Sequence, residues 1–223
     1  MRDTLSRDGA VLAPALLSGS EIETLRALAD EVVGGRPGAR LRGHPALARV
    51  LSLEGPVGAL AARHTSDKAR PVRAVMFDKT PDANWIVAWH QDRVIPVRER
   101  REVEGFGPWS TKDGVLHVAP PFDVLARMLT VRVHLDPVDA SNAPLRVALG
   151  SHRLGRVAAE TAAREAEALP QQICLAQVGD VWVYSTPILH ASDRADPPRQ
   201  RRVLQADYAD FDLPGGLEWL GIG

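Results

Sequence analysis

The sequence predicts a mainly β domain with flanking α-helices, in which an all-β barrel or jelly roll forms the core and N-terminal helices pack outside it. Residues 1–65 carry apolar side chains at helical spacing, whereas residues 72–210 break into short β-prone runs separated by turns. Helices followed by many short strands are typical of this architecture. A length of 223 residues suits one domain, so we expect a single domain over 1–223.

The N-terminal part is predicted to contain three helices. A capping-box pattern, Ser20 with Glu23, begins the first, and a Gly-Gly pair ends it. Two shorter helices are expected over 45–53 and 57–63, separated by a Gly-Pro pair. The first helix is recognised by its apolar residues at helical spacing, which are Ile22, Leu25, Leu28, Ala29 and Val32.

Short strands are predicted where β-prone residues lie between turn residues. Two helix-like stretches, 120–128 and 158–169, interrupt them. The strands are expected over 9–12, 72–77, 84–90, 130–135, 173–176, 181–185 and 202–208.

Two loops are candidates for covering a pocket. Residues 36–44 carry three arginines, which indicate either a solvated surface loop or a flap over a pocket that holds an anion. Residues 93–114 form a polar loop rich in Arg and Glu. A loop of this length in a compact domain is usually a lid or a binding loop, so we expect it to exclude water from a site.

Composition restricts the classes of function. The formal net charge of −1 gives no electrostatic reason to expect binding to nucleic acid or to an anionic membrane. No apolar run approaches the length of a membrane span, and the first residues, from Arg2 on, lack a hydrophobic signal region. Cys174 is the single cysteine, which excludes an intrachain disulfide and favours the cytoplasm. Any metal must therefore be held by histidines and carboxylates.

Two His-x-Asp pairs are candidates for holding such a metal. His90 and Asp92 follow an apolar stretch, 85–89, that we expect to be a buried strand. Residues two apart in a strand share a face, so this imidazole and this carboxylate supply two ligands of a 2-His-1-carboxylate iron site. His134 and Asp136 have the same spacing, and the residues alone leave both pairs open.

A third ligand and an anion-binding residue are predicted near the C-terminal strands. His190 follows an apolar pair and precedes small residues, which fits an inward position at the mouth of a barrel. Arg201 begins an alternating strand and shares a face with Gln205 and Asp207. A buried arginine needs a planar anionic partner, and no carboxylate is marked for it locally. A carboxylate cosubstrate would supply that partner.

The order and spacing of several short motifs resemble the phytanoyl-CoA dioxygenase family, whose members are non-haem iron(II), 2-oxoglutarate-dependent oxygenases. The resemblance spans roughly residues 77–208 and implies a jelly-roll core of the double-stranded β-helix type, with Fe(II), 2-oxoglutarate and O2. The motifs are Trp89-His90-Gln91-Asp92, Leu135-Asp136, Asn142-Ala143-Pro144-Leu145-Arg146, Gly150-Ser151-His152-Arg153-Leu154-Gly155, Gly179-Asp180, His190-Ala191-Ser192 and Arg201-Arg202. Ala143 and Leu149 depart from the family's usual turn residues, which affects loop geometry rather than ligands.

The resemblance assigns the metal site. It implies that His90, Asp92 and His190 bind the metal as the catalytic centre. Asp136 is then expected to cap the turn that follows it through local side-chain bonds, rather than to bind metal.

The resemblance also assigns the cosubstrate site. Arg201 and Ser192 are expected to hold the distal carboxylate of 2-oxoglutarate, and Trp109 to lie beside it. Lys79 and Asn84 are candidates for further polar contacts to cosubstrate or substrate. His117 and Arg93 are candidates for substrate contacts, with ordinary packing and a solvated loop as their respective alternatives.

The predicted activity is hydroxylation of a small organic substrate, coupled to decarboxylation of 2-oxoglutarate to succinate. The presence of Asp92 argues against a halogenase, because related halogenases lack this carboxylate. Two alternatives stay open. One is a jelly-roll protein that binds metal or ligand without oxygenase turnover, and the other is a cupin-like metalloenzyme that does not use 2-oxoglutarate. Neither the substrate nor the oligomeric state is predicted.

Overall fold

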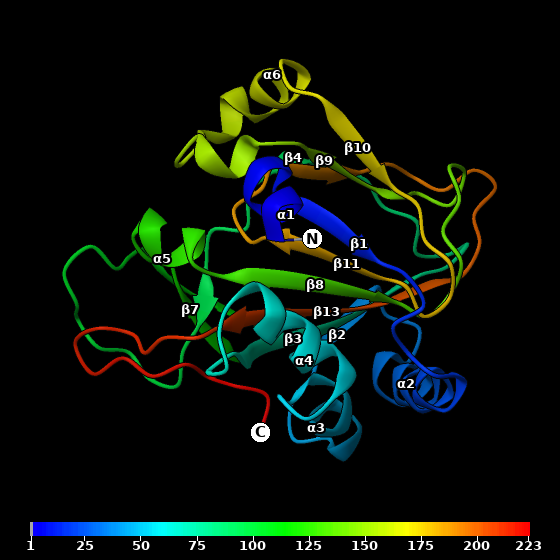
Figure 1. Ribbon diagram of the computed structural model, residues 1–223, viewed down its shortest axis with the longest axis horizontal. Helices are drawn as coiled ribbons and strands as arrows, with labels where there is room; N and C mark the ends of the chain where they lie inside the picture. Colours follow the sequence, from blue (N-terminus) through cyan, green and yellow to red (C-terminus); the bar gives the residue numbers. More distant parts are fainter. Residues whose placement is uncertain (1) are drawn as a thin grey trace.

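Two antiparallel sheets enclose the interior of the protein. The computed structural model describes residues 2–223, so residue 1 of the predicted domain lies outside it. Within these residues the larger sheet has six strands in the order β1-β11-β8-β13-β3-β2 (Figure 1). Its strands are β1 (Ala10–Ala13), β11 (Val181–Ser185), β8 (Leu129–His134), β13 (Arg201–Ala209), β3 (Arg70–Lys79) and β2 (Gly38–Arg40).

A four-stranded sheet, in the order β10-β9-β12-β4, packs against the inner face of the larger one. Apolar side chains from both sheets share one buried cluster, among them Trp182 and Tyr184 from the first and Leu145 and Val147 from the second. The strands of this sheet are β10 (Gln171–Cys174), β9 (Leu145–Ala148), β12 (His190–Ser192) and β4 (Val87–His90).

A third, small sheet lies beside α5 (Phe122–Ala126), in the order β5-β7-β6. Its strands are β5 (Ile95–Pro96), β7 (Val115–Val118) and β6 (Trp109–Lys112). Two of them fall inside the stretch 93–114, which was predicted to be a loop without strands. The prediction was wrong at this point because these strands are short and carry polar residues, as in Trp109-Ser110-Thr111-Lys112.

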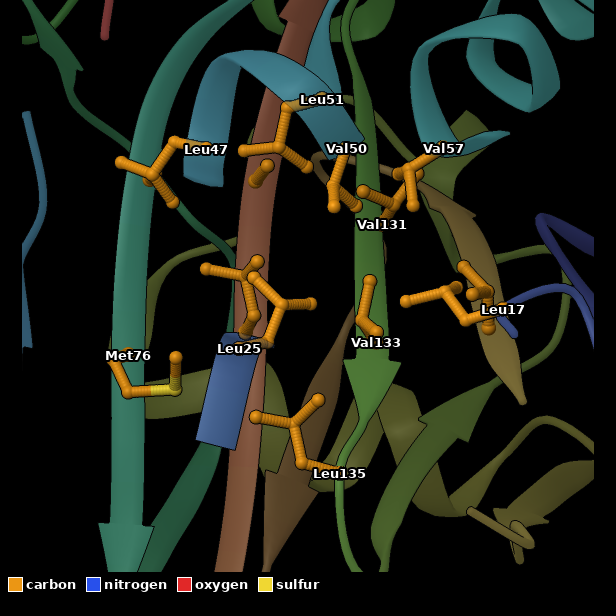
Figure 2. Packing of buried hydrophobic residues seen from close by; sticks show 14 of the residues in the cluster. Leu17, Leu25, Leu47, Val50, Leu51, Val57, Met76, Val131, Val133 and Leu135 are labelled. Carbon is orange, nitrogen blue, oxygen red and sulfur yellow. The ribbon is translucent and has the colours of Figure 1, made fainter. Parts of the chain in front are cut away.

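The predicted N-terminal helices cover the outer face of the six-stranded sheet (Figure 1). They are α2 (Gly19–Val33), α3 (Pro45–Leu51) and α4 (Pro56–His64). Figure 2 shows their leucines and valines interdigitating with Met76 of β3 and with Val131 and Val133 of β8. The remaining helices are α1 (Arg2–Asp8), α6 (Ala162–Glu167) and two 3-10 turns, η1 (Ser151–Arg153) and η2 (Ala159–Thr161). The helix predicted over 158–169 is therefore a 3-10 turn followed by a shorter α-helix.

Alternation along β13 separates a dry face from a polar one. Leu204, Ala206 and Tyr208 join the core beneath the helices. The intervening residues, among them Arg201 and Gln205, face the opposite sheet, as strand periodicity predicted. The larger sheet therefore presents polar side chains to the interior.

The helix α2 begins two residues earlier than its sequence pattern suggested. Ser18, not Ser20, is the N-cap: its Oγ accepts a hydrogen bond from the amide of Glu21, and the Glu21 carboxylate accepts one from the amide of Ser18. Gly34 ends the helix in the left-handed conformation, with φ of 55°. The prediction failed because two capping-box patterns overlap in this segment, each with a serine three residues before a glutamate.

Replacing Ser18 with alanine is expected to lower the free energy of unfolding by about 1 kcal/mol, the usual cost of losing an N-cap side chain. Ser20→Ala is the matched control and should cost less, because Ser20 already lies inside the helix. Urea denaturation of the two variants measures the difference. An equal loss from both variants would contradict the assignment of the cap.

Residues 85–89, predicted to form a buried strand, are half-buried or exposed. Ile86 is 59% exposed, and pairing begins only at Val87 in β4. This strand lies at the edge of its sheet and one side faces a cavity, so its apolar residues serve as wall rather than core. Among residues 2–223, no helix is both long and apolar enough to cross a lipid bilayer.

Candidate metal centre and its cavity

His90, Asp92 and His190 converge in space. The ligand atoms of these three side chains all lie within 4.8 Å of one another. The two histidines face each other because β12 pairs antiparallel with β4, with His190 opposite His90 and their ring centroids 4.2 Å apart. Asp92 lies just beyond the end of β4. The arrangement is the 2-His-1-carboxylate set that the sequence predicted.

Both imidazoles are held in one orientation by backbone carbonyls. The Nδ1 of His90 lies 2.8 Å from the oxygen of Ala88, and the Nδ1 of His190 lies 2.9 Å from that of Ile188. A carbonyl oxygen only accepts, so each Nδ1 carries the proton and each Nε2 keeps a free lone pair. Burial, followed by the neighbouring His90, lowers the pKa of His190 to about 4. His190 is therefore neutral at pH 7 and able to bind a metal.

The turn between the first two ligands is fixed by Gln91, which points away from them. Its side-chain amide donates to the carbonyls of Gly155 and Pro187, and its oxygen accepts from the amide of Val157. Gln91 is buried and uses both ends of its amide group. Three hydrogen bonds to backbone therefore set where Asp92 leaves the strand.

Arg73 holds the carboxylate of Asp92 from behind. Its Nη2 lies 3.3 Å from Asp92 Oδ2, and its Nε lies 2.7 Å from Asp207 Oδ2. Asp207 also accepts a hydrogen bond from Thr130 Oγ1 at 3.0 Å. Burial acts to raise the pKa of Asp92, but the neighbouring guanidinium of Arg73, its main basic neighbour, counteracts this and the pKa falls below its ordinary value. Asp92 is thus ionised and oriented for a cation.

The three ligands line a cavity of about 690 Å³ between the two sheets. This volume lies in the usual range for small-molecule sites. Phe77, Val87 and Leu145 contribute apolar wall. Away from the metal ligands the cavity is strongly basic, because Lys79, Arg132 and Arg201 line it and each is at least nine-tenths buried.

Arg201 is buried without a carboxylate partner among the described residues. It is 3% exposed, its Nη1 donates to the carbonyl of Ala143, and its Nε has no hydrogen-bond partner. Burial, with the nearby charge of Arg132, lowers its pKa to about 9. A buried and unpaired guanidinium is costly, so the geometry fits an anionic ligand that completes the site.

Lys79 and Ser192 lie beside Arg201. Lys79 pairs with Arg201 across the β3–β13 ladder, and its ammonium donates to the carbonyls of Trp85 and Asp193, each at 2.7 Å. Its Nζ is also 3.4 Å from Ser192 Oγ. Burial, then Arg201 and Arg132, lowers the pKa of Lys79 to about 8. An anion bound here would relieve the repulsion among these cations.

A sequence profile of the family described as Phytanoyl-CoA dioxygenase (PhyH) matches residues 5–203, most of the chain. The chain belongs to this family. The resemblance predicted from the motifs is thereby confirmed. A comparison with curated protein sequences returns no significant match.

Solved structures that resemble this member of the phytanoyl-CoA dioxygenase family share its fold at low identity. The epimerase SnoN, in complex with Fe3+, alpha ketoglutarate and nogalamycin RO, is 18% identical with a TM-score of 0.69, covering 96% of this chain and 89% of SnoN. EctD from S. alaskensis, in its apoform, is 17% identical with a TM-score of 0.71, covering 99% and 79%. HygX from Streptomyces hygroscopicus, with nickel, 2-oxoglutarate and hygromycin B, is 17% identical with a TM-score of 0.61, covering 94% and 87%. These likenesses confirm the mainly β, jelly-roll fold.

The donor set fits the metal and cosubstrate of the phytanoyl-CoA dioxygenase family. Two imidazoles and one carboxylate suit iron(II), and three ligands leave further positions open. The unpaired guanidinium of Arg201 in the same cavity suits a dicarboxylate such as 2-oxoglutarate. Iron and 2-oxoglutarate, predicted for this chain, are also the groups named in the SnoN complex.

Asn84 lines the cavity, but its side-chain amide already forms hydrogen bonds to the backbone of the protein. Its amide nitrogen donates to the carbonyl of Ala195, and its oxygen accepts from the amide of the same residue, both at 2.9 Å. This reciprocal pair ties the hairpin before β4 to the segment after β12. Asn84 thus has a structural task beside the one predicted for it.

Three other predicted site residues lie outside this cavity. Trp109 packs in the cluster around α5, with the guanidinium of Arg100 over its ring. His117 is fully buried and bonds through Nδ1 to the carbonyl of Val115. The guanidinium of Arg93 donates to the carbonyl of Val157. The structure therefore does not bring these three side chains to the metal ligands.

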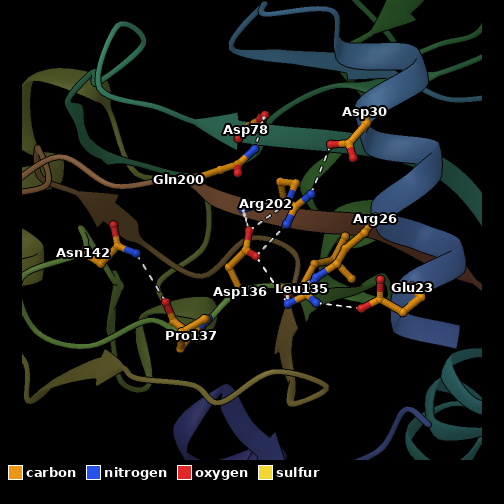
Figure 3. Close-up of polar contacts among 10 residues, drawn as sticks. All are labelled: Glu23, Arg26, Asp30, Asp78, Leu135, Asp136, Pro137, Asn142, Gln200 and Arg202. Atoms are coloured by element: carbon orange, nitrogen blue, oxygen red, sulfur yellow. Dashed lines mark hydrogen bonds and ion pairs between the residues drawn. The ribbon is translucent and has the colours of Figure 1, made fainter. Parts of the chain in front are cut away.

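The rival pair, His134 and Asp136, does not belong to the metal-ligating group found among residues 2–223. Figure 3 shows the Asp136 carboxylate bonded to Arg202 instead. Asp136 accepts from the Arg202 backbone amide at 2.8 Å and from its guanidinium at 3.0 and 2.9 Å. The expectation that Asp136 caps its own turn was wrong, since its partner is Arg202, 66 residues further on. His134 is buried, and burial, then Arg132, lowers its pKa to about 3.

Asp136→Ala is expected to lower the free energy of unfolding by about 2–3 kcal/mol, because the Arg202 guanidinium loses its two hydrogen bonds to a buried carboxylate and keeps only the exposed Asp30. Metal binding should be unchanged. Asp139→Ala, which removes a surface carboxylate bonded to Arg199, is the control and should have a smaller effect. Thermal unfolding and a metal titration on both variants check this. Loss of metal binding in Asp136→Ala would instead favour His134 and Asp136 as the metal ligands.

Proposed function

We propose that the protein is an Fe(II)/2-oxoglutarate-dependent oxygenase that hydroxylates a small organic substrate and converts 2-oxoglutarate to succinate. One observation carries this proposal. Three side chains suited to iron(II) and a buried, unpaired arginine line the same cavity. Family membership supports the oxygenase class, and the retained carboxylate of Asp92 favours hydroxylation over halogenation.

The residues of the chain have distinct roles in this reaction. His90, Asp92 and His190 would hold the iron, and Arg201 with Ser192 would hold the distal carboxylate of 2-oxoglutarate. When bound, iron(II) and 2-oxoglutarate, together with O2, would supply the oxidation of an unactivated C–H bond. Arg73 keeps Asp92 ionised and in place, and the carbonyls of Ala88 and Ile188 keep the imidazoles turned toward the cavity.

The rim of the cavity supports a role for both predicted covering loops in excluding water. Arg40, in the strand β2 within 36–44, forms an ion pair with Asp113, at the turn between β6 and β7. Both residues line the cavity. The two segments thus meet over one opening, and their contact is exposed enough to break and reform.

The cavity supports a small-molecule substrate rather than a macromolecule. Its walls combine Phe77, Val87, Leu145 and Trp85 with the polar rim, a mixture usual for small organic ligands. SnoN and HygX are each described with a small natural product bound. We further propose that the protein acts in the cytoplasm, consistent with its single buried and unpaired Cys174.

The test is formation of succinate from 2-oxoglutarate by purified protein with iron(II) in air, measured by chromatography against Asp92→Ala. Slow turnover is expected without a substrate, and faster turnover when a metabolite mixture contains one. Succinate formation no greater than in the variant under all conditions would support a binding protein without turnover. Turnover of a substrate unaffected by N-oxalylglycine would support a metalloenzyme that does not use 2-oxoglutarate.

A further inference from the structure

Arg132 is a second buried arginine of the cavity to which the sequence assigned no task. It lies in β8, is 7% exposed, and lines the cavity with the metal ligands. Its Nη1 donates to Gln205 Oε1 at 2.9 Å, and its Nε has no hydrogen-bond partner. No carboxylate among the described residues forms an ion pair with it. Its charge, like that of Arg201, therefore has no carboxylate to balance it, and the guanidinium lies over the face of the Phe77 ring, 5.6 Å from its centroid.

Strand register places Arg132 between the metal end and the Arg201 end of the cavity. On β13, Asp207 is paired with Arg73 at the metal end, and Arg201 is paired with Lys79 at the other. Gln205 lies between these two positions, and Arg132 is its partner on β8. Side chains two residues apart on one strand face the same way, so all these groups point into the same interior.

The electrostatic influence of Arg132 agrees with this middle position. Its charge lowers the pKa of Arg201 on one side and contributes to lowering that of His190 on the other. A ligand that reaches from the metal to Arg201 must therefore pass Arg132. Gln205 holds the guanidinium through Nη1 and leaves Nε free.

We propose that Arg132 binds the carboxylate of 2-oxoglutarate adjacent to the keto group, the end that chelates the metal, while Arg201 binds the distal carboxylate. The assignment gives each carboxylate of the dianion a buried guanidinium. It rests on the proposed function, since it needs 2-oxoglutarate as the cosubstrate. Arg132 then orients the cosubstrate at the metal rather than adding a second contact to its far end.

Two ligands separate the two arginines. In 2-oxovalerate a methyl group replaces the distal carboxylate, so this ligand keeps only the end assigned to Arg132. Calorimetric titrations would use nickel-loaded protein, which holds the cosubstrate without turnover. Arg132→Met should lower the affinity for both ligands by about 10–100-fold, the effect expected from losing a charge-assisted hydrogen bond. Arg201→Met should lower the affinity for 2-oxoglutarate by a similar factor and leave the affinity for 2-oxovalerate unchanged.

The exposed Arg164 gives a matched control, Arg164→Met, which should bind both ligands as the wild type does. Should Arg132→Met fail to fold, Arg132→Lys replaces it. This variant keeps the charge and loses the planar fork, so both ligands should again bind more weakly. A circular dichroism spectrum establishes folding before each titration.

Two outcomes would overturn the assignment. One is that Arg132→Met or Arg132→Lys binds 2-oxovalerate as tightly as the wild type does. The other is that the wild-type protein binds 2-oxoglutarate but fails to bind 2-oxovalerate at millimolar concentration. Failure of the wild type to bind 2-oxoglutarate itself would instead refute the proposed function. The two failures are therefore distinguishable in one series of titrations.

Discussion

Replacing Asp92 with alanine is expected to abolish both iron binding and succinate formation. The substitution removes the anionic ligand. The guanidinium of Arg73 would then face two imidazoles and the iron cation without the carboxylate charge that balances it. Even residues that only orient a ligand change metal affinity by about 10–100-fold, so loss of this ligand should weaken iron binding by at least about 100-fold. An anaerobic titration with iron(II), followed by a succinate assay, measures both effects.

Asp82→Ala is the matched control for this experiment. Asp82 is an exposed carboxylate that lines the same cavity and lies outside the ligand group. The control should bind one iron per chain with wild-type affinity. Wild-type turnover by Asp92→Ala, or equal losses in the two variants, would show that the metal ligands are wrongly assigned.

Arg201→Met is expected to stabilise the ligand-free protein while weakening its affinity for 2-oxoglutarate by about 10–100-fold. A buried guanidinium without a carboxylate destabilises the fold, and methionine fills similar volume without charge. Replacements of buried charges by apolar residues often stabilise by about 1–4 kcal/mol, and we expect about 1–2 kcal/mol here. In the wild type a bound anion should provide this compensation instead.

Thermal unfolding with and without 2-oxoglutarate measures both the stability of the ligand-free protein and its response to the ligand. The wild-type melting temperature should rise with the concentration of added ligand, because the ligand binds the folded state only. The melting temperature of Arg201→Met should start higher and change little at ligand concentrations that shift the wild type. Arg199→Met, which alters an exposed arginine nearby, should respond to ligand as the wild type does. A destabilised Arg201 variant that still responds to 2-oxoglutarate would contradict the role of this residue.

Strand periodicity was enough to predict the face on which Arg201 lies, because the pairing of β13 is regular over 201–207, before the irregularity between Asp207 and Tyr208, and the strand is central in its sheet. The same rule identified His90 and Asp92 as neighbours, although the strand that was to hold both ends at His90. Asp92 is placed instead by the locked side chain of Gln91. Local hydrogen bonds of this kind leave no periodic trace in a sequence.

The network behind the metal ligands could not be predicted, because it joins strands distant in the sequence. Arg73 of β3 lies between Asp92 and Asp207 only after β13 has paired with β3. The partnership of Asp136 with Arg202 has the same origin. Asp207 was noted on the face of Arg201, but nothing in the sequence indicated which charge it would meet. Pairing register decides these contacts, and register is a tertiary property.

The position of Trp109 could not be predicted from the family resemblance. The resemblance expected it beside the cosubstrate, whereas the structure packs it around α5. Its strand, β6, belongs to the small sheet formed by the stretch predicted as a lid. Loops and short polar strands vary most among related proteins, so residues within them transfer less reliably than those on the core strands.

Anomalous diffraction from crystals soaked with iron(II) under anaerobic conditions tests the central claim most directly. The account predicts one strong anomalous peak, bonded to the Nε2 atoms of His90 and His190 and to the carboxylate of Asp92. A peak elsewhere, for instance beside His134, or no bound iron at this position, would contradict it.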